Sequence, residues 1–239
     1  MMVSQFLTVQ QRAGPFVKAF STDRRSFLRR NVDSISEGVR RRCAPALSRT
    51  SVDKLELRLA LFGFDGIFYS LTFADEFLPQ NYEGVCRIWD AFYKRLKRWL
   101  RRALDRPLIY YVYRIEGLHG DHRWHIHVFL REQDFPPAVV QYLWDWGEVN
   151  MVLYNRERVL SAGGYRALAV YFTKEVPQVG RHPWGCSRQL GGLLPLPEVH
   201  LTDTGQLRVP RSAVRLPLAA PPKSTEWGVF SYVRYLDLK

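Results

Sequence analysis

The sequence predicts an α+β fold, in which a largely antiparallel central sheet has helices packed on it. Two observations predict this class. Between residues 67 and 176, β-branched and aromatic segments alternate with helical ones in the order β, α, β, β, α, β and then helix. The 239 residues are 46% hydrophobic and 14% aromatic, which is enough apolar material for a core and excludes a disordered chain.

The first predicted strand covers residues 67–73 and is followed, after Pro79, by an amphipathic helix over residues 82–104. Its apolar positions recur at steps of three and four, as expected of a helix that buries one stripe. Its other face is basic and carries Arg87, Lys94, Lys97, Arg98, Arg101 and Arg102. Such a face is either solvated or bound to phosphates, and we take these six cations as predicted DNA contacts.

The next predicted elements are two strands that flank a loop, then a helix and a further strand: residues 108–116, 123–131, 134–146 and 149–154. A helix is expected over 162–176. Beyond Pro177 the chain is rich in proline and glycine, with a hairpin expected over 200–209 and a strand over 230–236.

These elements suggest three regions. Residues 1–50 are rich in arginine and poor in periodicity, so we expect a basic N-terminal extension. Residues 51–192 are expected to form the main domain. Residues 193–239 are expected to pack on that same domain.

The charge balance gives a net charge of +12, from 35 Lys and Arg against 23 Asp and Glu. A surface this basic attracts polyanions, and nucleic acid is the first expected partner. No segment is apolar over the 18 to 20 residues that a bilayer crossing requires, so we expect no membrane partner. Three scattered cysteines, Cys43, Cys86 and Cys186, favour a reducing compartment, and we expect a cytoplasmic protein.

A histidine pair lies in the predicted strand over 123–131. His125 and His127 share one face of that strand, about 7 Å apart, because successive side chains alternate between faces. If the strands over 108–116 and 123–131 form a hairpin, Glu116 lies across from the pair and can supply a third ligand. Two imidazoles and one carboxylate leave positions open for a substrate, and a phosphate substrate favours Mg²⁺ or Mn²⁺, although Zn²⁺ is also tolerated.

Two other interpretations stay open. An isolated His-x-His pair is often incidental, and its side chains can simply be hydrogen-bonded within the protein. His119, Asp121 and His122 form a rival zinc cluster in the loop, although without cysteine partners.

A second motif lies on the predicted helix over 162–176. Tyr171 and Lys174 are three residues apart and therefore share a face. A phenol is rarely ionised at neutral pH, and it becomes a useful nucleophile when a cation stabilises the phenolate or a metal activates the electrophile. The alternative is a core tyrosine beside a surface lysine.

Together these motifs resemble the HUH (His-hydrophobic-His) endonucleases, specifically the rolling-circle replication initiators, or Rep proteins, of small phages and plasmids. The resemblance covers about residues 65 to 192 and rests on three motifs in order. They are Ser70-Leu71-Thr72-Phe73 with the acidic turn after it, Glu116 nine residues before His125-Ile126-His127, and Tyr171-Phe172-Thr173-Lys174-Glu175. A segment like that of the small phage and plasmid initiators follows at Trp184-Gly185-Cys186-Ser187-Arg188-Gln189-Leu190.

The resemblance implies a palm-like α+β fold and a metal-dependent endonuclease and strand transferase. Tyr171 would attack a phosphate in single-stranded DNA at a replication origin, giving a 5′-phosphotyrosine and a free 3′-OH, and would later rejoin the strand. Lys174 would assist, His125, His127 and Glu116 would hold the metal, and Arg123 and Arg188 would join the six helix cations as DNA contacts. Unwinding and synthesis are expected from a host helicase and polymerase.

The sequence departs from initiators that carry two catalytic tyrosines. The nearest other tyrosine, Tyr165, lies six residues before Tyr171 and about 240° around the helix, which argues against a paired mechanism. Two alternative functions stay open. One is a non-catalytic single-strand-binding module that uses the aromatic strand over 110–113 for base stacking, and the other is a single-strand HUH transposase. The oligomeric state does not follow from the sequence.

Overall fold

The computed structural model describes residues 6–23, 51–117, 123–174, 184–217, 224–225 and 228–238. The chain divides into two compact units. Unit 1 comprises residues 1–61, 163–166 and 194–239, and unit 2 comprises residues 62–162 and 167–193. Both units contain an antiparallel sheet together with helices, so the predicted α+β class is confirmed.

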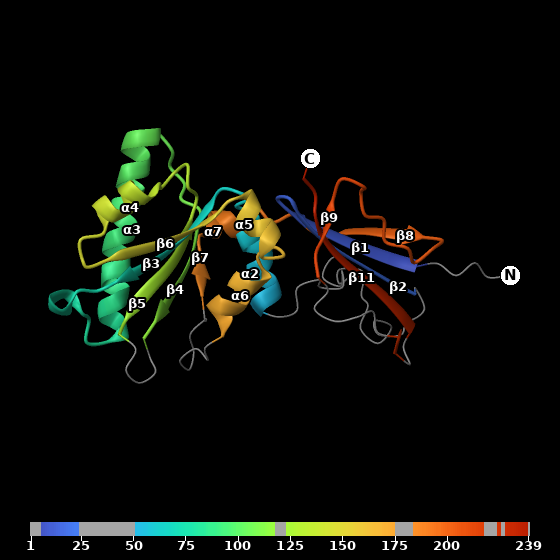
Figure 1. Ribbon diagram of the computed structural model, residues 1–239, viewed down its shortest axis with the longest axis horizontal. Coiled ribbons are helices and arrows are strands. Elements are labelled where there is room, and N and C mark those ends of the chain that lie inside the picture. The colour runs from blue at the N-terminus through green and yellow to red at the C-terminus, as the bar shows by residue number, and fades with distance from the viewer. Residues whose placement is uncertain are drawn as a thin grey trace, which may run out of the picture. The chain divides into compact units, whose positions relative to one another are not determined.

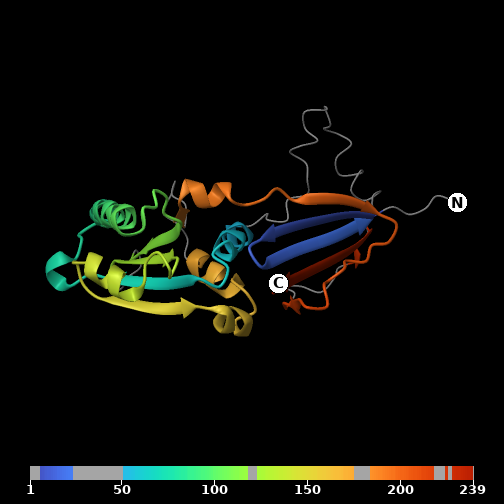
Figure 2. The same ribbon diagram turned by 90° about the horizontal axis from the view of Figure 1, so that it is seen from above.

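Unit 1 is built on a sheet whose described strands run in the order β10-β11-β2-β1-β8, with β9 paired to β11. Their bounds are Phe6–Ala13 (β1), Phe16–Asp23 (β2), Glu198–Thr202 (β8), Val214–Arg215 (β9), Ser224–Thr225 (β10) and Gly228–Leu236 (β11). Figure 2 shows β1 and β2 side by side, between β8 and β11. Helix α2 (Ser51–Ala60) also belongs to this unit and buries Leu55, Leu57 and Leu59.

This arrangement differs from the three regions that the sequence suggested. Residues 6–23 form a β-hairpin that turns at Gly14, and β1 alternates buried and less buried side chains as a half-buried strand does. Strand β11 contains the expected late strand and pairs with β2, and β8 pairs with β1 in place of the expected hairpin. The two ends of the chain thus build one sheet, through pairings that span about two hundred residues.

Unit 2 contains a sheet whose described strands run in the order β6-β3-β5-β4-β7. The bounds are Gly66–Thr72 (β3), Tyr111–Glu116 (β4), His125–Leu130 (β5), Val149–Tyr154 (β6) and Gly185–Cys186 (β7). The helices of this unit are α3 (Tyr82–Leu104), α4 (Pro137–Leu143), α5 (Arg156–Ser161), α6 (Arg166–Thr173) and α7 (Arg188–Gly192), with a 3-10 turn at Asp75–Phe77. Helix α6 begins with the last residue of a short unit 1 segment.

The core of unit 2 lies between one face of its sheet and helices α3 and α4. Trp89, Phe92 and Leu96 of α3 pack with Ile126 and Val128 of β5 in this core. Because side chains alternate along β5, His125 and His127 point to the other face, where α6 packs. In Figure 1, α3 and α4 lie on one side of the sheet and α6 on the other.

The helix expected over 162–176 is shorter than the sequence suggested. Gly163 and Gly164 adopt positive φ values of 65° and 94°, so the chain breaks there between α5 and α6. Of the helices in the described ranges, none combines the length and apolar character that a bilayer crossing requires.

Candidate metal and tyrosine site

The hairpin of β4 and β5 brings the expected ligands together. Glu116 lies directly opposite His125, and the pair one step further along is Arg114 and His127. All four side chains therefore share the face of the sheet opposite the α3 core. On the other side of β5, Ser70 of β3 is the partner of His127.

The three expected ligands converge. Glu116 Oε2 lies 3.1 Å from His125 Nε2 and 3.4 Å from His127 Nε2. One ligand atom from each residue lies within 4.8 Å of the others, so this group could hold a metal ion. Glu116 and His127 are buried and His125 is partly exposed, which leaves one side of the group open to a substrate.

The hydrogen bonds around the imidazoles favour a cation at this place. His125 Nδ1 lies 2.9 Å from the carbonyl oxygen of Arg123, which can only accept, so Nδ1 carries the proton. In a neutral ring, Nε2 is then an acceptor that faces another acceptor, the Glu116 carboxylate. Two acceptors 3.1 Å apart are compatible with a proton or a metal ion between them.

His127 is oriented in the same way. Its Nδ1 lies 3.0 Å from Ser70 Oγ, and its Nε2 lies 2.9 Å from the hydroxyl of Tyr171. When the phenol donates to Nε2, Nδ1 donates to Ser70, and Nε2 faces Glu116 as a ligand atom. Ser70 is thus an outer-sphere partner of the kind that orients metal-binding histidines.

The electrostatics keep the ligands in their metal-binding forms. Burial raises the pKa of Glu116, but hydrogen bonds from His125 and His127 and the charge of Arg114 outweigh it and hold the pKa well below its usual value. Burial lowers the pKa of His127, although Glu116 opposes this. An ionised carboxylate and a neutral imidazole are the forms that bind a metal.

Tyr171 and Lys174 lie next to this group. Tyr171 contacts His127 through its hydroxyl, and its ring packs edge-on against Phe68 of β3. Lys174 Nζ lies 4.4 Å from the centroid of the Tyr171 ring, a cation–π distance. The sequence therefore named five residues, from two strands and a helix, that the structure brings together. Tyr165 precedes α6 and is fully buried.

Arg114 is a further member of the site that the sequence analysis did not identify. Its Nε lies 2.9 Å from Glu116 Oε1, and its Nη1 donates to the carbonyl oxygens of Phe172 and, at 3.4 Å, Tyr171. The buried guanidinium thus joins the carboxylate of the ligand group to the last turn of the helix that carries Tyr171. The available signal was its position two residues before Glu116, on the same face.

The six cations expected to contact DNA are not near the ligand group. Arg87, Lys94, Lys97, Arg98, Arg101 and Arg102 are exposed on α3, on the helix side away from the sheet, whereas the ligands lie on the opposite sheet face. Arg123 forms an ion pair with Asp75 and donates to the carbonyl of Phe73, beside His125. Arg188 is exposed at the start of α7.

The aromatic strand that supported a base-stacking module is covered by protein. The ring of Tyr113 stacks on Trp89 of α3 with centroids 4.4 Å apart, and Tyr111 packs edge-on against the same indole. Burial raises the pKa of both phenols to about 12. Helix α3 therefore occupies the surface that bases would need. The rival zinc cluster at His119, Asp121 and His122 lies outside the described residues.

Comparison with known proteins points to DNA replication. Residues 66–176 match a family of replication-associated proteins, the one described by its member ORF2. The match runs from β3 past the end of α6 and contains Glu116, His125, His127 and Tyr171. No curated protein and no solved structure matches the chain. The family match supports a replication initiator and DNA as a partner.

Proposed function

We propose that this protein is a rolling-circle replication initiator that nicks single-stranded origin DNA and forms a covalent link through Tyr171. The observation that carries the proposal is the distance of 2.9 Å between the Tyr171 hydroxyl and His127 Nε2. This places a phenol against the Glu116–His125–His127 group, within a segment that matches replication-associated proteins.

The donor set fits a divalent cation. Glu116 Oε2, His125 Nε2 and His127 Nε2 would hold it, and Ser70 and the Arg123 carbonyl keep both imidazoles turned toward it. Bound there, Mg²⁺ or Mn²⁺ would act as a Lewis acid that polarises a phosphate oxygen. The open side at His125 gives the phosphate access.

The surrounding residues prepare the nucleophile. The phenol of Tyr171 is held by His127 Nε2, and Lys174 lies over its ring, where a positive charge favours a developing phenolate. Arg114 holds the carbonyls of the last helical turn, so the hydroxyl keeps its place beside the ligand group.

The proposed reaction is a transesterification. A bond forms between Tyr171 Oη and the phosphorus while the bond from phosphorus to the 3′ oxygen breaks. The phenolic proton is transferred through solvent to the departing 3′ oxygen. The products are a 5′-phosphotyrosine and a free 3′-OH. Because one phosphoester replaces another, the strand can be rejoined by the reverse step without ATP.

The direct test is incubation with Mn²⁺ and a pool of single-stranded oligonucleotides, followed by mass spectrometry of tryptic peptides. We expect a nucleotide-modified peptide that contains Tyr171, and none when EDTA is present. A protein that binds single strands without cutting would be indifferent to EDTA. An excess of hairpin ends among the cleaved sequences would favour the transposase alternative.

Two tyrosine variants complete the test. Tyr171→Phe removes the nucleophilic oxygen and should abolish the adduct while DNA binding remains. Tyr165→Phe is the matched control, since it removes the same atom from a buried tyrosine that lies before α6, and it should retain the adduct. An adduct that persists in Tyr171→Phe would contradict the proposal.

A further inference from the structure

Helix α3 has two opposite faces. Val85, Trp89, Phe92, Leu96 and Leu100 are buried against the sheet of unit 2. The outer face carries the six exposed cations, and five of them surround a depression of about 410 Å³: Lys94, Lys97, Arg98, Arg101 and Arg102. Their aliphatic stems line this depression, with the charged ends around it.

These cations are not neutralised by the protein. In the part of unit 2 that the structure describes, none of the six forms an ion pair, whereas Arg95, Arg106, Arg114 and Arg123 each contact a carboxylate. Helix α3 also has no acidic residue after Asp90. Like charges one turn apart on a helix repel each other, so this face gains from a polyanion that neutralises it.

The α3 face and the ligand group cannot contact the same nucleotide. His125 and His127 point away from the α3 core because Ile126, between them, points into it. The sheet and the body of α3, with a diameter of about 10 Å, separate the two surfaces. The α3 cations must therefore bind a different stretch of nucleic acid from the one at Tyr171.

The composition of the α3 face favours a duplex. Proteins that hold single strands combine cations with aromatic side chains on which bases stack. None of the aromatic residues of α3 is exposed, and Trp89 and Tyr93 are engaged with Tyr111. Cations without stacking surfaces suit a duplex, whose bases are stacked internally and whose phosphates face outward.

We propose that the outer face of α3 binds the phosphate backbone of duplex DNA, while a single strand lies on the opposite face of the sheet. The assignment of the single strand rests on the proposed function, but the duplex surface can be tested without it. Phosphate contacts position a protein without reading sequence, so this binding is independent of the duplex sequence.

The experiment compares the wild type with a Lys97→Gln, Arg101→Gln double variant. Affinities for a blunt duplex and for one of its separated strands are measured by fluorescence anisotropy at several salt concentrations. Each lost phosphate contact lowers the slope of log K against log salt by about 0.9. Between about 50 and 200 mM salt, the wild type should therefore lose about tenfold more duplex affinity than the variant does.

A control and an activity measurement separate the outcomes. Arg208→Gln, Arg211→Gln makes the same change in net charge at exposed positions of unit 1 and should leave the duplex slope unchanged. Adduct formation on single strands should be the same in all three proteins. Equal effects of both double variants, an unchanged duplex slope in the α3 variant, or an equal loss of single-strand affinity would each overturn the inference. A wild type that forms no adduct would contradict the proposed nicking but leave the duplex result standing.

Discussion

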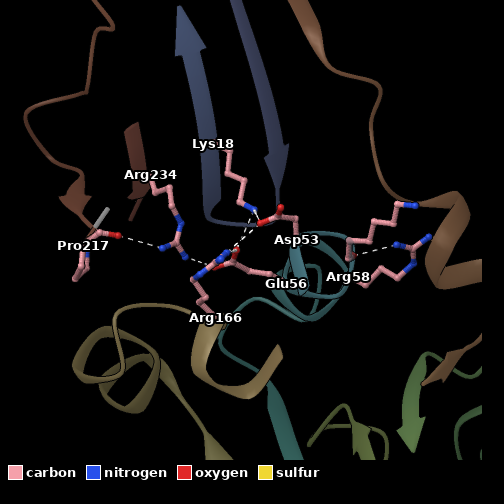
Figure 3. A network of polar contacts seen from close by, with 8 residues as sticks. Lys18, Asp53, Glu56, Arg58, Arg166, Pro217 and Arg234 are labelled. Carbon is pink, nitrogen blue, oxygen red and sulfur yellow. Dashed lines mark hydrogen bonds and ion pairs between the residues drawn. The ribbon is translucent and has the colours of Figure 1, made fainter. Parts of the chain in front are cut away.

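Each unit contains a buried carboxylate among basic groups, and the two are built differently. In unit 1, Glu56 is fully buried and surrounded by fixed cations, as Figure 3 shows. Lys18 Nζ lies 2.9 Å from Glu56 Oε2, Arg166 lies 3.5 Å from the same oxygen, and Arg234 contacts Oε1. Asp53 shares Lys18 and Arg166 with it. Both oxygens of Glu56 are therefore bound to permanent charges.

In unit 2, Glu116 has a permanent cation on one oxygen only. Arg114 contacts Oε1, whereas Oε2 faces two imidazole nitrogens. The comparison shows what separates an ion-pair network that stabilises a fold from a site that can bind a ligand. A carboxylate whose oxygens are both paired has no coordination left, whereas one that faces neutral imidazoles gains from an added cation.

The largest expected effect is on the stability of unit 1. Glu56→Gln leaves Lys18 and Arg234 buried without their carboxylate, and breaking a buried pair in this way costs about 3–5 kcal/mol. Urea unfolding should show an earlier transition that reports on β2 and α2. Mn²⁺ affinity, measured from the electron paramagnetic resonance of free Mn²⁺, should be unchanged. A loss of Mn²⁺ affinity in this variant would break the distinction between the two clusters.

The matching change in unit 2 should mainly affect metal binding. Glu116→Gln replaces a ligand oxygen and removes its charge, so Mn²⁺ affinity should fall by about 100-fold or more. Thermal unfolding provides a second readout. Mn²⁺ should raise the melting temperature of the wild type and of Glu56→Gln, but not that of Glu116→Gln, because only a bound metal stabilises the folded state.

How far the sequence reached depends on the range of each interaction. The ligand group was predictable because a two-residue alternation and one hairpin fix it: Glu116 opposite His125, with His127 on the same face. The place of α3 was also contained in the sequence. The apolar stripe of α3 has to cover Ile126 and Val128, which puts its cations behind the histidines, but the two patterns have to be combined to see this.

Other features depend on contacts that local patterns do not contain. The pairing of β11 with β2 joins Phe230 to Thr22, and neither segment alone indicates its partner. Arg114 could not be told from the other arginines of a basic chain, since its role depends on carbonyls of a helix more than fifty residues away. The position of Tyr171 beside His127 likewise results from tertiary packing, although the motif itself was recognised.

A smaller effect is expected from buried arginines that are matched in exposure. Arg114→Lys keeps the charge but cannot reach both Glu116 and the carbonyls of α6, because an ammonium lacks the planar fork of a guanidinium. We expect Mn²⁺ affinity to fall about tenfold and the rate of adduct formation at saturating Mn²⁺ to fall as well. Arg234→Lys, equally buried, should lower stability without either effect. Equal losses of metal affinity in both variants would mean that Arg114 acts through general stability alone.

The smallest effect tests whether the orientation of an imidazole matters in addition to its presence. Ser70→Ala removes the partner of His127 Nδ1, which leaves the ring free to turn or to change tautomer, and Mn²⁺ affinity should fall by about tenfold or less. Thr72→Ala is the matched control on the same face of β3, because its hydroxyl donates to the carbonyl of Glu148 and contacts no ligand. If the two variants bind Mn²⁺ alike, the orientation of His127 comes from packing against Phe68, whose ring stacks on the imidazole with centroids 4.9 Å apart.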